Sequence, residues 1–140
     1  MGKIKVLLIE DALLIRERLV SALEKFGETI EISYATKMPE AFVAFIDHKP
    51  DIIVLDISIQ DGNGIWILEK VKKTNPNIIV IVFTNFPFPQ VKKKCLKLGA
   101  DYFFSKENEF RELISTFELI IHEKKVNTEN HVDENNLKEN

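Results

Sequence analysis

Three uninterrupted runs of apolar residues constrain the fold of this chain more than any other feature. They are rich in β-branched residues and occupy positions 6–9, 52–55 and 78–83. Runs of this length, without alternation of polar and apolar residues, are typical of strands buried on both faces of a parallel sheet. Because such a sheet needs helices on both faces, the runs predict an α/β domain.

Weaker strand patterns and helical periodicities fill the rest of the chain in regular alternation. Two further strands are expected at 31–35 and 102–104. Apolar spacing, with Pro or Gly at several boundaries, predicts five helices, at 15–26, 40–48, 65–75, 90–98 and 107–124. This βα order, repeated five times, predicts a doubly wound five-stranded parallel sheet with right-handed crossovers. In such sheets, functional groups gather at the carboxyl ends of the strands.

Composition limits the domain count and excludes several classes of protein. The chain has 140 residues, a formal net charge of −3 and one cysteine. These values fit one domain without disulfides and give no general attraction to nucleic acid or to anionic membranes. The longest apolar run is far shorter than the roughly 20 residues that cross a bilayer, and the first residues lack a signal-peptide pattern, so we expect a cytoplasmic protein. Residues 126–140 are mostly polar, and we expect a folded domain at 1–125 followed by a disordered polar tail at 126–140.

Polar side chains follow four of the predicted strands. Glu10 and Asp11 follow the first strand, Asp56 ends the third, Thr84 ends the fourth and Lys106 follows the fifth. With a strand order of 2-1-3-4-5, these side chains converge on one edge of the sheet. Three carboxylates in one place repel each other unless a cation lies among them, and oxygen ligands without histidine or thiolate favour Mg²⁺. A carboxylate beside Mg²⁺, a hydroxyl and an ammonium is the set that phosphoryl transfer to an aspartate needs.

The sequence resembles the receiver domain of bacterial two-component response regulators over nearly all of residues 3–122. Four motifs in order carry the resemblance: Val6-Leu7-Leu8-Ile9-Glu10-Asp11, Asp56-Ile57-Ser58-Ile59 with the later Gly64, Val82-Phe83-Thr84, and Gly99-Ala100-Asp101-Tyr102-Phe103-Phe104-Ser105-Lys106. Each motif is weak alone, but four of them in order are specific. The resemblance implies a flavodoxin-like fold in which a five-stranded sheet of order 2-1-3-4-5 is flanked by five helices.

The resemblance also implies roles for the residues at the strand ends. Asp56 would accept the phosphoryl group, and Thr84 and Lys106 would contact it. Mg²⁺ would be held by Glu10, Asp11, Asp56 and the backbone carbonyl of Ser58. Thr84 and Phe103 would form a switch pair, in which Thr84 moves toward the phosphate and Phe103 turns inward.

A stand-alone response regulator is the function that the resemblance implies. A histidine kinase or a histidine phosphotransfer protein would phosphorylate Asp56 in a magnesium-dependent step, docking on Leu14 and Ile15 at the start of the first helix. The signal would pass to a downstream protein, without direct binding to nucleic acid or membrane, from a monomer or a phosphorylation-dependent dimer. Beyond self-catalysed phosphorylation and dephosphorylation, we expect no enzyme activity.

Simpler interpretations and two other functions remain open at this point. Asp11 could cap the first helix and Asp56 could stabilise a turn. A degenerate receiver, which binds proteins without being phosphorylated, is the alternative, because Asn85 follows Thr84 and because Gln60 and Glu107 stand where the family often has proline. A hydrolase with an aspartyl-phosphate intermediate would need a substrate-covering insertion, and the connections between the predicted elements are too short for one.

Overall fold

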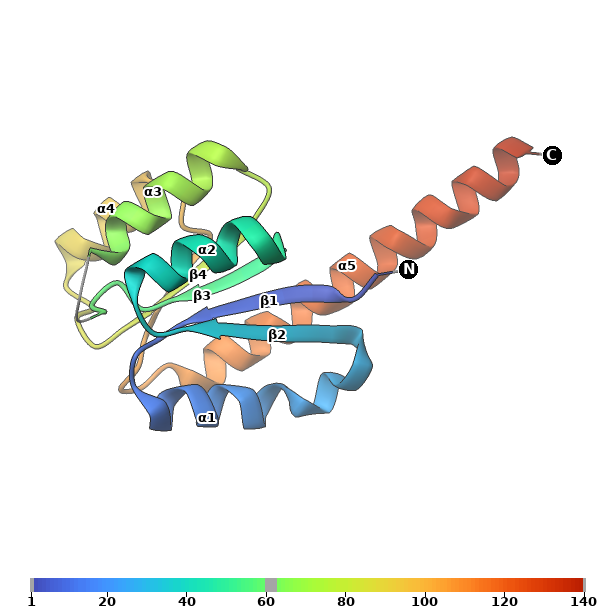
Figure 1. The fold of residues 1–140 in the computed structure, drawn as a ribbon. Helices are drawn as coiled ribbons and strands as arrows, with labels where there is room; N and C mark the ends of the chain where they lie inside the picture. Colours follow the sequence, from blue (N-terminus) through green and yellow to red (C-terminus); the bar gives the residue numbers. More distant parts are fainter. Residues whose placement is uncertain (1, 60–62, 140) are drawn as a thin grey trace. The chain divides into compact units, whose positions relative to one another are not determined.

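The central sheet has the predicted topology. The computed structural model describes residues 2–59 and 63–139, with the side chains of the last helix described as far as Thr128, so that Gln60 lies outside the described residues. Five parallel strands are arranged in the order β2-β1-β3-β4-β5 (Figure 1). They are β1 (Ile4–Ile9), β2 (Ile30–Ala35), β3 (Ile52–Leu55), β4 (Ile79–Thr84) and β5 (Tyr102–Ser105). The predicted α/β class and strand order are confirmed.

Five α-helices alternate with the strands, as predicted. They are α1 (Leu13–Leu23), α2 (Met38–His48), α3 (Gly64–Thr74), α4 (Pro89–Lys97) and α5 (Phe110–Glu139). Within the compact unit formed by residues 1–110, α1 lies on one face of the sheet and α2, α3 and α4 lie on the other (Figure 1). The three apolar runs lie in or beside the central strands β1, β3 and β4, where nearly every residue is buried. Burial on both faces explains why these runs show no alternation.

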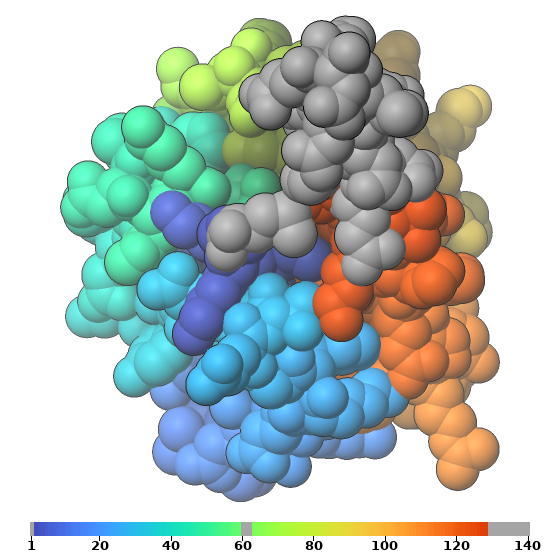
Figure 2. All heavy atoms as spheres, turned by 90° about the vertical axis from the view of Figure 1, so that its right-hand side faces the viewer, coloured from blue at the N-terminus to red at the C-terminus, as the bar shows by residue number. Residues whose placement is uncertain are grey.

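The first helix is shorter than its apolar stripe predicts. It ends at Leu23, and residues Glu24–Thr29 form 3₁₀ turns, labelled η1, on the surface of the molecule (Figure 2). Gly27 in this segment has a φ of 54° and a ψ of −129°, a conformation that strains any residue with a side chain. Gly27 therefore ends the helical stretch as predicted. The apolar spacing did not predict, however, that the residues around Gly27 form 3₁₀ turns.

The last helix is longer than predicted. Residues 111–140 form a second compact unit, and α5 continues to Glu139 rather than ending near residue 124. The sequence after residue 107 contains neither Gly nor Pro, so no residue in it breaks a helix. The assignment of residues 126–140 as a tail outside the domain stays a prediction.

The strand register brings the polar residues to one edge of the sheet. Ile9 pairs with Leu55, Leu55 with Val82, and Val82 with Phe103. These four residues form a buried row across β1, β3, β4 and β5. Because the strands are parallel, the polar residues that follow this row leave the sheet on the same side.

A lysine on α3 holds the beginnings of β4 and β5 together at the opposite edge. The Lys72 ammonium donates hydrogen bonds to Asp101 Oδ2 at 2.7 Å and to the Ile78 carbonyl at 2.5 Å. Asp101 Oδ2 also accepts a hydrogen bond from the Val80 backbone N–H at 2.9 Å. The Lys72 side chain is largely buried, so Asp101 of the fourth sequence motif has a structural role.

Asp101→Ala is expected to lower the free energy of unfolding by about 2 kcal/mol, because it removes the counter-charge of Lys72 and the acceptor for Val80. Urea denaturation measures this change. Glu69→Ala is the control, since the Glu69–Lys73 ion pair at 3.0 Å is exposed on the same helix and should contribute less than about 0.5 kcal/mol. Equal losses in the two variants would contradict the structural role of Asp101.

Candidate functional site

The three predicted metal-binding acids lie together at the carboxyl edge of the sheet. One carboxylate oxygen from each of Glu10, Asp11 and Asp56 lies within 4.8 Å of the others. Hydrogen bonds that continue the sheet position two of them: the Glu10 N–H donates to the Ala35 carbonyl at 3.0 Å and the Asp56 N–H donates to the Ile9 carbonyl at 2.9 Å. The parallel pairing of β1 with β2 and β3 therefore brings these acids together although they are far apart in sequence.

Lys106 supplies the positive charge that was predicted for this site. Its ammonium donates a hydrogen bond to Asp56 Oδ2 at 2.9 Å and forms an ion pair with Glu10 Oε1. The side chains of Lys106, Glu10 and Asp56 are only 3–4% exposed. The backbone N–H of Lys106 donates to the Thr84 carbonyl at 2.9 Å, which ties the lysine to the end of β4. One ammonium among three carboxylates leaves an excess of negative charge.

Burial and neighbouring charges give the two buried carboxylates opposite protonation behaviour. Burial, together with the adjacent Asp56 carboxylate, raises the pKa of Glu10 to about 7 against the opposing effect of Lys106. Burial also opposes ionisation of Asp56, but the adjacent Glu10 side chain and the hydrogen bonds from Ser58 and Lys106 outweigh it and lower the pKa of Asp56. Asp56 is therefore ionised at neutral pH, which a nucleophilic carboxylate requires.

The Asp56 carboxylate is also held at the oxygen that Lys106 does not contact. Asp56 Oδ1 accepts a hydrogen bond from the Ser58 backbone N–H at 2.9 Å and another from the Ser58 hydroxyl at 2.7 Å. The backbone carbonyl of Ser58 stays a predicted metal ligand. Both oxygens of Asp56 therefore have defined partners, which fix the orientation of this carboxylate.

The site fits a hard divalent cation. Glu10 Oε2 is buried and has no hydrogen-bond partner within residues 2–59 and 63–128. A buried carboxylate oxygen without a donor is costly unless a cation or water contacts it. The clustered ligand atoms are all carboxylate oxygens, the type that Mg²⁺ prefers. Glu10, Asp11 and Asp56 therefore have the chemistry of a magnesium site.

Gly64 allows α3 to approach the loop that follows Asp56. A Cβ atom at this position would lie 2.3 Å from the Ile57 Cα atom and 2.9 Å from the Asp56 carbonyl oxygen. The Gly64 N–H donates to the Ile57 carbonyl at 3.2 Å, and the Asn63 side chain caps the helix by accepting from the Ile65 N–H. The glycine of the second sequence motif is thus explained by a close backbone contact beside Asp56.

The two predicted switch residues lie on adjacent strands, Thr84 at the end of β4 and Phe103 within β5. Thr84 is fully buried, and its hydroxyl oxygen accepts a hydrogen bond from the Phe86 backbone N–H at 3.0 Å. Phe103 is 6% exposed and belongs to the hydrophobic core. The side chain of Phe103 is therefore already buried in this structure, before any inward turn of the kind expected on phosphorylation. Asn85, the larger residue after Thr84, is exposed.

The predicted docking residues differ in exposure. Leu14 is 79% exposed, whereas Ile15 is half-buried. Leu13 is also exposed, so the start of α1 presents two leucines to solvent beside the acidic cluster. The geometry at Leu14 is compatible with partner contact, and Ile15 offers less of its surface.

Arg16 is a residue of the site that the sequence did not single out. Its guanidinium Nη1 donates hydrogen bonds to the carbonyl oxygens of Glu10, at 3.1 Å, and Asp11, at 3.3 Å. It also lies over the ring of Tyr34, with its central carbon 5.0 Å from the ring centroid. The arginine that follows the acidic pair by five residues was the only hint in the sequence. Arginines on helix surfaces are too common for this spacing to predict a role.

The fold and the acidic cluster define a response regulator receiver domain. The sequence model of that family, the response regulator receiver domain, matches residues 6–118, so the chain belongs to this family. Receiver domains are signalling domains. Within the part of the chain that the structure describes, no helix has both the length and the apolar character needed to cross a membrane.

Several characterised proteins and solved structures are similar to this chain. The chemotaxis protein CheY of Thermotoga maritima is 32% identical over 106 residues, which are 76% of this chain and 87% of that protein. The protein-glutamate methylesterase/protein-glutamine glutaminase 3 of Geobacter sulfurreducens is 31% identical over 106 residues, but this chain spans only 28% of its length. The signal receiver domain of the DNA-binding response regulator protein merR from Colwellia psychrerythraea has a TM-score of 0.80 and 27% identity, covering 86% of this chain and 99% of that chain.

Proposed function

We propose that this protein accepts a phosphoryl group on Asp56, in a magnesium-dependent step, from a histidine kinase or a histidine phosphotransfer protein. The observation that carries the proposal is the buried Asp56 carboxylate held between Lys106 and Ser58 beside two further acids. The alternative, a receiver that is never phosphorylated, is not favoured because Asp56, Thr84 and Lys106 are all retained in place. The cytoplasmic location and the action without an attached output domain stay predictions.

Asp56 and Lys106 have defined parts in the transfer. An Asp56 oxygen attacks phosphorus and displaces the nitrogen of the donor histidine, which carries away the electron pair of the broken bond. Mg²⁺, when bound, neutralises charge on the phosphoryl oxygens. The Lys106 ammonium, now paired with Asp56 and Glu10, provides a second positive charge for those oxygens.

Thr84 is prepared to contact the transferred group. Its hydroxyl oxygen already accepts the Phe86 N–H, so the hydroxyl proton remains available for donation to a phosphoryl oxygen. Movement of Thr84 toward the phosphate would lengthen its bond with Phe86 and thereby alter the loop between β4 and α4. The exposed rings of Phe86 and Phe88, stacked with centroids 6.2 Å apart, lie in that loop, so the change would reach the surface.

The phosphodonor would dock at the start of α1. Leu14 is exposed there, three residues after Asp11 of the acidic cluster. We propose that Leu14, with a smaller contribution from Ile15, contacts the apolar face of the donor's helices. A downstream protein would then recognise the phosphorylated form, as a monomer or as a dimer.

Intact-mass spectrometry of the wild-type protein tests this function. Incubation with Mg²⁺ and a small phosphodonor such as acetyl phosphate should add the mass of one phosphoryl group, and chelation of Mg²⁺ should prevent the addition. Borohydride reduction turns an acyl phosphate into an alcohol, so peptide mapping after reduction should place the modification at residue 56. A protein that gains no mass under these conditions would exclude the proposed function.

A further inference from the structure

Arg16 is bound to the backbone of both acids that precede α1. Its Nη1 lies 3.1 Å from the Glu10 carbonyl oxygen and 3.3 Å from the Asp11 carbonyl oxygen. The carboxylates of the same two residues belong to the acidic cluster. Arg16 therefore contacts the backbone of the two acids and not their carboxylates.

The loop between β1 and α1 lacks a side-chain helix cap. Its N-cap residue is Ala12, which forms no side-chain cap hydrogen bond. Ser, Thr, Asp or Asn at this position would fix the loop through such a bond. Alanine cannot form such a bond. The hydrogen bonds from Arg16 to the carbonyl groups of residues 10 and 11 hold this loop from a different side.

Tyr34 holds the guanidinium in place from the neighbouring strand. The central carbon of Arg16 lies 5.0 Å from the Tyr34 ring centroid, within the range of a cation–π contact. The residue after Tyr34, Ala35, accepts the Glu10 N–H at 3.0 Å. The two polar backbone groups of Glu10 are thus held from two sides, the N–H by β2 and the carbonyl by Arg16.

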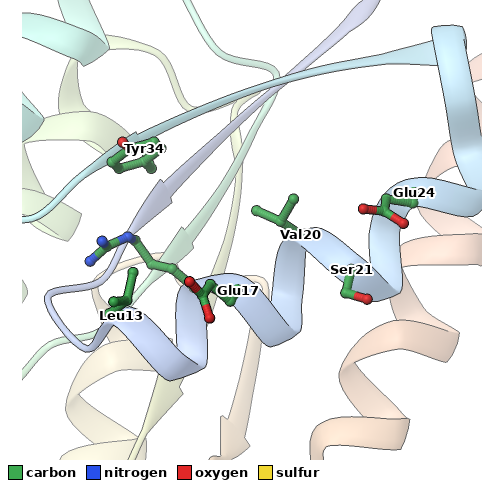
Figure 3. Close-up of a pocket in the computed structure, with 7 residues that line it drawn as sticks. Leu13, Glu17, Val20, Ser21, Glu24 and Tyr34 are labelled. Carbon is green, nitrogen blue, oxygen red and sulfur yellow. The ribbon is translucent and has the colours of Figure 1, made fainter.

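The Tyr34 ring can be changed without disturbing the hydrophobic core. It is 62% exposed, and with Leu13 and Glu17 of α1 it lines an open groove of about 400 Å³ (Figure 3). A substitution at Tyr34 therefore removes the support of Arg16 but leaves the packed residues of β2 in place.

We propose that Arg16 is a positioning residue for magnesium binding and that Tyr34 supports it. Bringing the carboxylates of Glu10, Asp11 and Asp56 within 4.8 Å of each other requires a rigid backbone, because their mutual repulsion favours separation in the absence of a cation. Arg16 supplies that rigidity through the two carbonyl groups. This inference rests on the proposed function, since it assigns the role to the metal used in phosphorylation.

Calorimetric titration with Mg²⁺ alone tests the inference. Arg16→Ala should raise the dissociation constant about tenfold, the scale of losses when a group that orients metal ligands is removed. Tyr34→Leu should raise it by a smaller factor, and Arg16→Lys should restore part of the affinity because an ammonium can still reach one carbonyl. Arg18→Ala is the matched control and should bind Mg²⁺ as the wild type does. The central guanidinium carbon of Arg18 lies 3.7 Å from the ring centroid of Phe110, so its contact is with this ring.

The magnesium dependence of phosphorylation separates a positioning role from general damage. In Arg16→Ala, the half-saturating Mg²⁺ concentration should rise while the rate at saturating Mg²⁺ stays near that of the wild type. Unchanged Mg²⁺ affinity in Arg16→Ala, or an equal loss in Arg16→Ala and Arg18→Ala, would overturn the inference while the proposed function stands. A wild-type protein without Mg²⁺ affinity would overturn both.

Discussion

Asp56→Asn is expected to abolish phosphorylation of this protein by acetyl phosphate in the presence of Mg²⁺. The amide keeps the size of the carboxylate, so the buried site can close around it. It has no anionic oxygen to attack phosphorus, and it removes one of the negative charges that attract the metal. Intact mass should show no added phosphoryl group after an incubation that modifies the wild type.

Asp51→Asn is the matched control for this loss. Asp51 lies just before β3, at the end of that strand opposite to Asp56, and its Oδ2 accepts the Lys5 backbone N–H at 2.8 Å. The same chemical change at this position should leave phosphorylation intact. Phosphorylation of Asp56→Asn to the wild-type extent would show that another residue is the acceptor.

The fold could be predicted from the sequence because its signals are local and strong. The continuous runs at 52–55 and 78–83 have the composition of doubly buried strands, and they form β3 and most of β4. Helix ends were less accurate where tertiary context decides them. Gly27 does break the helical stretch, but the 3₁₀ turns before it depend on how the chain enters β2, and the length of α5 depends on the absence of any breaking residue.

The site could be predicted in outline for a geometric reason. In a parallel sheet, the residue that follows each strand reaches the same edge, so Glu10 and Asp56 meet once the strand order is known. Contacts in which a long side chain bridges two elements leave no such pattern in the sequence. The hydrogen bonds of Arg16 to two carbonyl groups and the Lys72–Asp101 pair depend on the direction of long side chains.

Glu10→Gln is expected to stabilise the metal-free protein at alkaline pH while it weakens Mg²⁺ binding. The pKa of Glu10 rises from 4.5, its ordinary value, to about 7 in the folded protein. The contribution of protonated Glu10 to the free energy of unfolding is fully present below pH 4.5, where the folded and the unfolded chain both carry the proton. It is lost as the pH rises to about 7, because the unfolded chain ionises first. Above pH 7 the folded protein must hold an ionised Glu10 in a buried site.

Glutamine resembles the protonated form of Glu10 at every pH, so the variant avoids this loss. Without metal at pH 8, its free energy of unfolding should exceed that of the wild type by roughly 2 kcal/mol, and the difference should vanish near pH 4.5. Urea denaturation at the two pH values measures both quantities, with Glu69→Gln as the exposed control. Addition of Mg²⁺ at pH 8 should stabilise the wild type and reverse the order of the two proteins, because the metal binds the ionised carboxylate. A variant no more stable than the wild type in the metal-free state at pH 8 would show that burial of Glu10 does not oppose its ionisation.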